Sequence, residues 1–176
     1  FAEANQKKQD SMSKFVMIIF GASGDLTKRK LMPALYSLYK DNRLPEGFAI
    51  LGIGRTDYAD ETYRDYILNE LEHFVTPAEV GMKEFCTHLH YLSMDPAIEE
   101  GYGTLDSHLQ EITGEKKPDN LLFYLATPPS LYGVIPLHLK TAGLNRKHTR
   151  IIVEKPFGYD LKSAQELNHI YASVFE

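Results

Sequence analysis

The clearest chemical signal in the chain is a short loop with two glycines, Gly21-Ala22-Ser23-Gly24. It follows an unbroken apolar run and directly precedes a stretch with helical periodicity, the setting in which a loop binds the phosphates of a dinucleotide. Gly21 would allow a tight turn, and Gly24 would let the backbone approach a pyrophosphate at the start of the helix. The spacing is shorter than G-x-G-x-x-G, so a plain strand-to-helix turn stays open as the alternative.

Asp25, the next residue, carries a charge that would repel a pyrophosphate. We therefore expect its carboxylate to accept backbone N–H groups at the start of the helix, where the helix dipole favours a negative charge.

Arg55 follows a second apolar run and indicates which cofactor the loop would bind. Sites for NAD usually place an acidic residue at this strand end, where it binds the ribose 2′-hydroxyl. Here Arg55 and Thr56 replace it, and the planar guanidinium of arginine suits a 2′-phosphate. The sequence thus favours NADP over NAD, the alternative being a surface arginine that caps a loop.

Alternating strands and helices must position these residues. Short apolar runs predict strands over residues 15–20, 48–54, 89–92, 120–126 and 150–154. Helical spacing or helix-end signals predict helices over residues 25–41, 63–74, 76–86, 102–112, 131–142 and 161–174, with Gly143 capping the fifth. This order predicts an α/β fold, a doubly wound and mostly parallel sheet of the Rossmann-like type.

In such a sheet, ligands bind outside the carboxyl ends of the strands. Gly21, Ala126, Thr127, Glu154 and Lys155 all lie at predicted strand ends. We therefore expect them to converge on one crevice, with Lys155 contacting cofactor or substrate; the alternative for Lys155 is a solvated charge.

Composition excludes several classes of protein. The net charge is −5 and no long basic block occurs, so we expect no nucleic acid and no anionic membrane as partner. No apolar run approaches the roughly 20 residues of a membrane helix. Cys86 is the only cysteine, which excludes an internal disulfide and fits a reducing, cytoplasmic location.

Residues 1–14 are polar and are expected to form a disordered arm, leaving residues 15–176 as one dinucleotide-binding domain. His88 and His90 alternate on a predicted strand without an evident third ligand, so no metal is expected. None of the seven histidines lies in a context that points to the glycine loop, although an alcohol oxidation needs a base of this kind.

Three segments together resemble the glucose-6-phosphate dehydrogenase family. They are the loop GASGDLTKRKL from Gly21 to Leu31, the segment FYLATPP from Phe123 to Pro129, and the segment IVEKPFG from Ile152 to Gly158. The first and third are similar to the family's GxxGDLxxRKL and EKPFG motifs. Thr27 departs from the pattern, since the family often has alanine there.

The resemblance implies NADP as cofactor and the oxidation of glucose 6-phosphate at C1 to its lactone, the first step of the oxidative pentose phosphate pathway. It also implies two groups of site residues. The residues expected to bind the cofactor are Gly21, Ala22, Ser23, Gly24, Asp25, Leu26, Thr27, Lys28, Arg55, Asp95, Tyr124, Pro128 and Lys155. Those expected to contact the substrate are Lys30 and Lys155, the latter aimed by Pro156.

The family's catalytic histidine lies in an R-I-D-H-Y-L-G-K-E segment that this sequence does not contain. We therefore expect the proton acceptor beyond Glu176, a cofactor domain that binds NADP with little or no turnover, and a full-length protein that is a homo-oligomer. Two other classes stay open: a non-catalytic NADP-sensing module and a structural or interaction domain.

Overall fold

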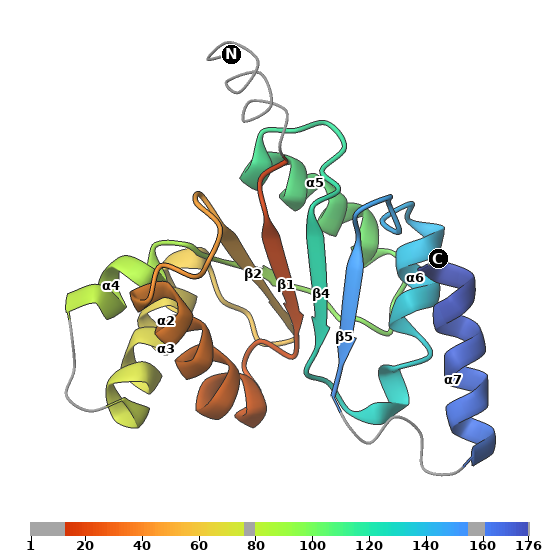
Figure 1. Cartoon of the computed structure of the whole chain (residues 1–176), viewed down its shortest axis with the longest axis horizontal. Coiled ribbons are helices and arrows are strands. Elements are labelled where there is room, and N and C mark those ends of the chain that lie inside the picture. The colour runs from red at the N-terminus through yellow and green to blue at the C-terminus, as the bar shows by residue number, and fades with distance from the viewer. Residues whose placement is uncertain (1–12, 76–79, 155–160, 176) are drawn as a thin grey trace.

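Five parallel strands form one sheet in the computed structural model, which describes residues 13–75, 80–154 and 161–175. The strands are β1 (Val16–Phe20), β2 (Ala49–Gly54), β3 (Leu89–Ser93), β4 (Leu121–Leu125) and β5 (Arg150–Val153). Their order in the sheet is β3-β2-β1-β4-β5 (Figure 1). The predicted doubly wound α/β fold is confirmed, and the strand order reverses direction between β1 and β4.

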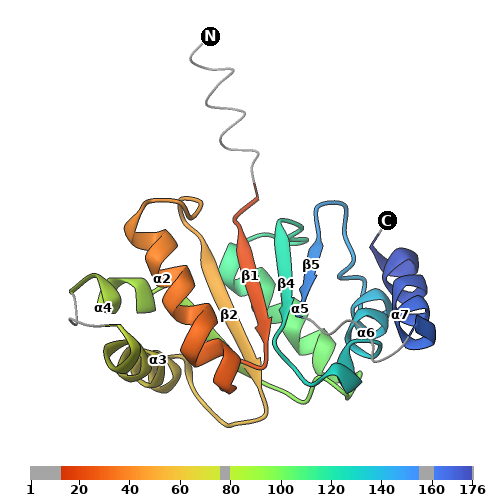
Figure 2. The same ribbon diagram turned by 60° about the horizontal axis from the view of Figure 1, so that its bottom comes forward.

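Helices cover both faces of this sheet, as Figure 2 shows. One face is covered by η1 (Thr27–Leu31), α2 (Met32–Lys40), α3 (Asp60–Phe74) and α4 (Val80–Cys86). The other face is covered by α5 (Gly101–Thr113), η2 (Pro129–Leu131), α6 (Ile135–Thr141) and α7 (Leu161–Val174).

Strand β1 lies at the centre of the two-sided core. All five of its residues are buried, and successive side chains point to opposite faces of the sheet. Ile18 and Phe20 belong to the core cluster formed with α5 and α6. Met17 and Ile19 belong to the cluster formed with α2, α3 and α4. Burial on both faces explains why this strand is an unbroken apolar run.

The first helix differs in detail from the prediction of a regular helix over residues 25–41. Residues 27–31 form a π turn, η1, in which the N–H of Met32 donates to the carbonyl of Thr27, five residues back. Pro33 lies in the next turn and has no N–H to donate to Arg29, four residues back. Such π turns inside helices are rare and are found frequently at functional sites.

The helix predicted from residue 131 begins later, at Ile135. Pro136 cannot donate to the carbonyl of Tyr132, which instead accepts a 2.7 Å hydrogen bond from the hydroxyl of Tyr171. Gly143, the predicted cap, follows the helix with φ of +71°. The helix predicted over residues 76–86 is α4 from Val80 onward, and residues 76–79 lie outside the described ranges.

Ser13 and Lys14, which we expected in the disordered arm, are bonded to the fold. The Ser13 hydroxyl donates to Asp119, and the Lys14 ammonium donates to the carbonyl of Ile112. Residues 1–12 of the predicted arm lie outside the described ranges. In the described part of the chain, no helix has the length and apolar character that crossing a membrane requires.

Candidate nucleotide-binding site

A groove of about 510 Å³ lies at the carboxyl ends of β1, β2 and β4. Its lining residues come from four loops: Gly21, Ser23, Ile53, Gly54, Arg55, Thr56, Asp95, Pro96, Ala97, Ala126, Thr127, Pro128, Ser130 and Leu131. The groove lies where the strand order reverses, the position at which open α/β sheets bind ligands. Five of the predicted cofactor residues, together with Ala126 and Thr127, therefore meet in one place.

Gly21 is held between the two neighbouring strands. Its φ is +93°, and a Cβ at this position would lie 2.3 Å from the carbonyl oxygen of Ala126. Its N–H and that of Ala22 both donate to the carbonyl of Ile53, at 2.9 and 3.0 Å. Only glycine can adopt this conformation at so short a distance from a neighbouring strand. Gly21 therefore allows the loop to pass directly over the edge of the sheet.

The next residues of the loop lead into the helix. Gly24 donates its N–H to the carbonyl of Gly21 at 3.2 Å, and Asp25 and Leu26 are already helical. The first N–H groups of a helix have no acceptor within it, so this end can bind an anion. Ala22 and Thr27 are buried behind the loop, where their side chains support it.

Asp25 does not cap the helix as we expected. Its carboxylate makes no hydrogen bond to the backbone in the described structure and instead lies 3.7 Å from the Lys28 ammonium and 3.3 Å from the Arg29 guanidinium. Because Asp25 is itself helical, its side chain faces residues three and four positions on, which are both cations.

The two loop lysines do not line the groove. Lys28 lines a separate hollow with Arg29, Asn69, Glu70, His73 and Phe74. Lys30 is exposed on η1. The structure therefore brings neither of these two predicted contacts to Arg55 and Pro128.

Arg55 and Thr127 both bring to the groove hydrogen-bonding groups that no described residue uses. Arg55 is exposed just after β2 and makes no ion pair or hydrogen bond within the described ranges. The Thr127 hydroxyl oxygen is buried and lacks a partner among the described residues. Asp95, in contrast, accepts the N–H of Ala97 at 2.9 Å. A glycine that a Cβ would block, a free guanidinium and an unpaired hydroxyl together fit a phosphorylated dinucleotide.

Tyr124 lies on β4 with its hydroxyl donated to the Glu154 carboxylate. Burial raises the pKa of Tyr124 well above its usual value, and the Glu154 bond adds to this effect. Lys155 and Pro156 lie outside the described ranges, so the structure does not test their predicted contacts with cofactor and substrate.

Two residues that support the groove were not among the predicted site residues. Tyr63 donates its hydroxyl to the carbonyl of Ala22, and Tyr91 donates to the carbonyl of Thr56. A signal for them was present, because Gly52 and Gly54 alternate within a strand and such glycines mark the close approach of another group.

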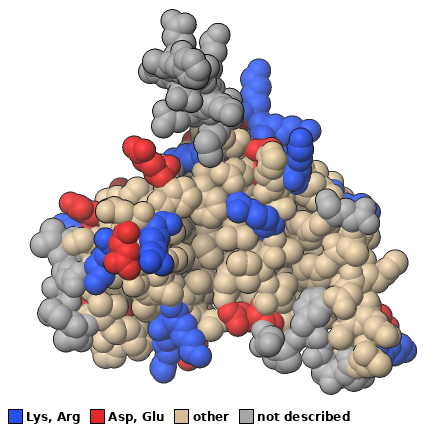
Figure 3. Space-filling view, viewed as in Figure 1, with Lys and Arg blue, Asp and Glu red and all other residues tan. Residues whose placement is uncertain are grey.

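A second groove, of about 610 Å³, lies at the opposite, amino ends of β4 and β5. Lys147 and Arg150 line it together with Asp119 and Asn120, and Figure 3 shows blue side chains gathered toward this end of the molecule. Although this groove is the larger, open α/β sheets bind their ligands at the other edge. Within the described ranges, no cluster of three or more His, Cys, Asp or Glu side chains could hold a metal ion.

Comparison with known proteins gives a family for this arrangement. Residues 18–176 match the family described as "Glucose-6-phosphate dehydrogenase, NAD binding domain". The chain is 45% identical over 164 residues to glucose-6-phosphate 1-dehydrogenase of Aggregatibacter actinomycetemcomitans, covering 91% of this chain and 33% of that protein. It is 35% identical over 171 residues to the enzyme of Bacillus subtilis (strain 168), covering 96% of this chain and 34% of that protein.

Solved structures give the same result. The crystal structure of glucose-6-phosphate 1-dehydrogenase from Mycobacterium avium matches with a TM-score of 0.80 at 29% identity, over 94% of this chain and 35% of that one. A glucose-6-phosphate dehydrogenase solved "in complex with its substrate glucose-6-phosphate" matches with a TM-score of 0.80 at 35% identity, over 94% of this chain and 36% of that one. The chain spans about a third of the length of these relatives.

Proposed function

The chain belongs to the glucose-6-phosphate dehydrogenase family, in which it matches the NAD binding domain, and from this premise we propose that it binds NADP in the groove at the carboxyl ends of β1, β2 and β4. The observation that carries the proposal is the meeting of Gly21 and Arg55 in one groove. Gly21 brings a backbone loop close to the sheet edge, and Arg55 offers a permanent positive charge without a described partner.

The loop would hold the pyrophosphate. The backbone of residues 21–24 and the first N–H groups of the helix supply donors and the positive end of the helix dipole. Leu26 and Thr27 would act from behind the loop, Leu26 by packing partly buried against the core and Thr27 by a bond to Gly21. Asp25 would restrain Lys28 rather than touch the cofactor, given their ion pair.

The other walls would hold the two ends of the dinucleotide. Arg55 would bind the 2′-phosphate through its planar fork of donors. Asp95 and Pro128 would lie beside the bound cofactor, as both line the groove. The unpaired Thr127 hydroxyl is a further group that a bound nucleotide would satisfy.

For the full-length protein we propose the oxidation of glucose 6-phosphate at C1, with NADP accepting the hydride. Lys30 and Lys155 would contact the sugar phosphate, and the proton acceptor would come from sequence beyond Glu176. We propose a homo-oligomer for that protein and a cytoplasmic location, which the single buried thiol of Cys86 supports.

Calorimetric titration of this chain with NADP⁺ and, separately, with NAD⁺ tests the cofactor proposal. We expect tighter binding of NADP⁺ and a loss of roughly 10- to 100-fold in NADP⁺ affinity for Arg55→Ala, since a charged hydrogen bond contributes about 1.5–3 kcal/mol. The affinity for NAD⁺ should stay unchanged, because NAD⁺ has no 2′-phosphate.

Arg43→Ala is the matched control, because Arg43 is also exposed but lies after α2, at the other end of the sheet. Equal weakening by both variants would mean a general charge effect and would contradict the role of Arg55. Absence of binding by either nucleotide would overturn the proposal for this chain. Turnover of glucose 6-phosphate at about 1 s⁻¹ or more, as in intact enzymes, would show that the chain holds its own proton acceptor.

A further inference from the structure

Four tyrosines pack together beside the nucleotide groove. They are Tyr58, Tyr63, Tyr66 and Tyr91, contributed by the loop before α3, by α3 itself and by β3. The rings of Tyr63 and Tyr91 are the nearest pair, with centroids 4.7 Å apart. Both side chains belong to the core on the α2 and α3 side of the sheet.

The hydroxyls of this pair reach the two loops that form the groove. The Tyr63 hydroxyl donates a 2.9 Å bond to the carbonyl of Ala22, in the phosphate loop. The Tyr91 hydroxyl donates a 2.5 Å bond to the carbonyl of Thr56, the residue after Arg55. One pair of packed tyrosine side chains thus connects the loop proposed for the pyrophosphate with the loop proposed for the 2′-phosphate.

Two glycines of β2 provide the space for these hydroxyls. A Cβ on Gly52 would lie 3.0 Å from the Tyr63 hydroxyl oxygen and 2.7 Å from the Cβ of Ala22. A Cβ on Gly54 would lie 2.8 Å from the Tyr91 hydroxyl oxygen. Because both glycines point to the same face of the strand, their spacing of two residues is explained by the tyrosine pair.

Both hydroxyls are in the form that can donate. Burial raises the pKa of Tyr63 well above its usual value, and burial raises the pKa of Tyr91 to about 12. Near neutral pH each therefore keeps the proton that its bond to a carbonyl requires.

We infer that Tyr63 and Tyr91 are positioning residues with separate tasks: Tyr63 fixes the phosphate loop, and Tyr91 fixes the Arg55 loop and so strengthens the preference for a 2′-phosphate. This inference rests on the proposed binding of NADP. It assigns part of the cofactor specificity to a side chain on β3 that does not itself line the groove.

Titration of three variants with both nucleotides tests the inference. Tyr91→Phe should lower the affinity for NADP⁺ by roughly 3- to 10-fold, the size expected for one hydrogen bond, and leave the NAD⁺ affinity unchanged. Tyr63→Phe should lower both affinities by the same factor, because both nucleotides contain the pyrophosphate. Tyr39→Phe is the control, since the Tyr39 hydroxyl makes no hydrogen bond within the described ranges, and it should change neither affinity.

If Tyr91→Phe lowered the affinities for NADP⁺ and NAD⁺ equally, or lowered neither, the role of Tyr91 in specificity would be overturned. Hydrogen exchange of the nucleotide-free chain separates this failure from failure of the proposed function. Tyr63→Phe should speed exchange of the Gly21 and Ala22 amides, and Tyr91→Phe that of the Met94 amide, which donates to the carbonyl of Gly54. If the wild-type chain binds neither nucleotide, the proposed binding of NADP is wrong. Unchanged hydrogen exchange in both variants would independently refute the positioning roles of Tyr63 and Tyr91.

Discussion

The hydroxyl of Thr27 donates a 2.7 Å hydrogen bond to the carbonyl of Gly21, closing the phosphate loop from its buried side. Thr27 is fully buried in the π turn that follows the loop. Gly21 has a positive φ and lies against Ala126. The bond from Thr27 therefore fixes the residue that sets the path of the phosphate loop. Thr27 is also where the sequence departs from the family's usual alanine, and the departure adds a contact.

Replacing Thr27 by valine removes this bond while keeping the shape of the side chain. We expect Thr27→Val to lower the free energy of unfolding by about 0.5–1.5 kcal/mol, the net contribution of one hydrogen bond, because the Gly21 carbonyl then keeps only its bond from the Gly24 N–H. NADP⁺ affinity should fall as well, since the loop is less well held. Urea unfolding and calorimetric titration measure the two effects. Thr27→Ser keeps the hydroxyl and should bind NADP⁺ as the wild type does; equal binding by the valine variant would contradict the role of the bond.

An alanine at Gly21 should abolish nucleotide binding. Its Cβ would lie 2.3 Å from the Ala126 carbonyl oxygen, and its φ of +93° is unfavourable for any residue with a Cβ. The loop must then move off the end of β4. Backbone strain alone costs about 1–3 kcal/mol, and the clash with Ala126 adds to it. Thermal unfolding should therefore show a larger loss of stability than this.

Gly47→Ala is the control for backbone strain. Gly47 also has a positive φ, of +71°, but no atom lies near the position of a Cβ. This variant should lose about 1–2 kcal/mol of stability and bind NADP⁺ normally. If both alanine variants bound NADP⁺ equally, close approach at Gly21 would not matter for the site.

The groove was predictable because its main residues are placed by topology. Once the apolar runs are interpreted as parallel strands, Gly21, Arg55 and Thr127 must lie at one edge of the sheet, whatever their side-chain contacts. The strand limits were also close to those observed, because buried strands of parallel sheets are continuous apolar runs.

Contacts between side chain and backbone were less predictable. The bond from Tyr63 to Ala22 joins residues 41 positions apart, and that from Tyr91 to Thr56 joins residues 35 positions apart. Such pairs depend on how α3 and β3 pack and not on local spacing. The wrong expectation for Asp25 has a local cause, because Lys28 and Arg29 compete for its carboxylate at helical spacing.

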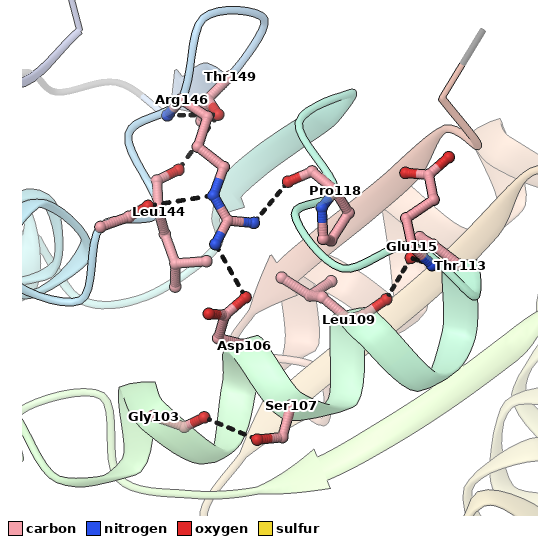
Figure 4. Close-up of polar contacts among 11 residues, drawn as sticks. Gly103, Asp106, Ser107, Leu109, Thr113, Glu115, Pro118, Leu144, Arg146 and Thr149 are labelled. Carbon is pink, nitrogen blue, oxygen red and sulfur yellow. Dashed lines mark hydrogen bonds and ion pairs between the residues drawn. The ribbon is translucent and has the colours of Figure 1, made fainter. Parts of the chain in front are cut away.

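Arg146 joins three segments at the end of the molecule opposite the groove. Its guanidinium donates to Asp106 on α5 at 3.1 Å, to the carbonyl of Pro118 at 2.6 Å and to the carbonyl of Gly143 at 3.1 Å (Figure 4). The Arg146 side chain is only 9% exposed and that of Asp106 is 24% exposed, so this ion pair is partly shielded from water.

Truncation of Arg146 should therefore lower the stability of the fold without changing the affinity for NADP⁺. We expect Arg146→Ala to cost about 3 kcal/mol, because Asp106 keeps a half-buried charge without its partner. Arg150→Ala, which removes an exposed bond to Asn120, should cost less than about 1 kcal/mol. Thermal unfolding compares the two variants. A large change of NADP⁺ affinity in a folded Arg146→Ala protein would show that the two ends of the sheet are coupled.

Cys86 should be unreactive in the folded chain and should make stability depend on alkaline pH. The thiol is 3% exposed, and burial raises its pKa from 9.0 to about 12. Between these values the unfolded chain loses the proton and the folded chain keeps it, so stability is full below pH 9 and falls as pH rises toward 12. The slope from one proton is at most about 1.4 kcal/mol per pH unit.

Two measurements check this expectation. Alkylation by iodoacetamide at pH 8 should proceed only as fast as the chain unfolds, because the thiolate is the reactive form. Urea unfolding from pH 9 to 10 should show a shallower loss of stability in Cys86→Ala than in the wild type, because the variant has no thiol to titrate. The range ends at pH 10 because tyrosines in the unfolded chain titrate near that pH. Fast alkylation of the folded chain, or parallel pH profiles for the two proteins, would mean that the thiol is not shielded where α4 packs against α3.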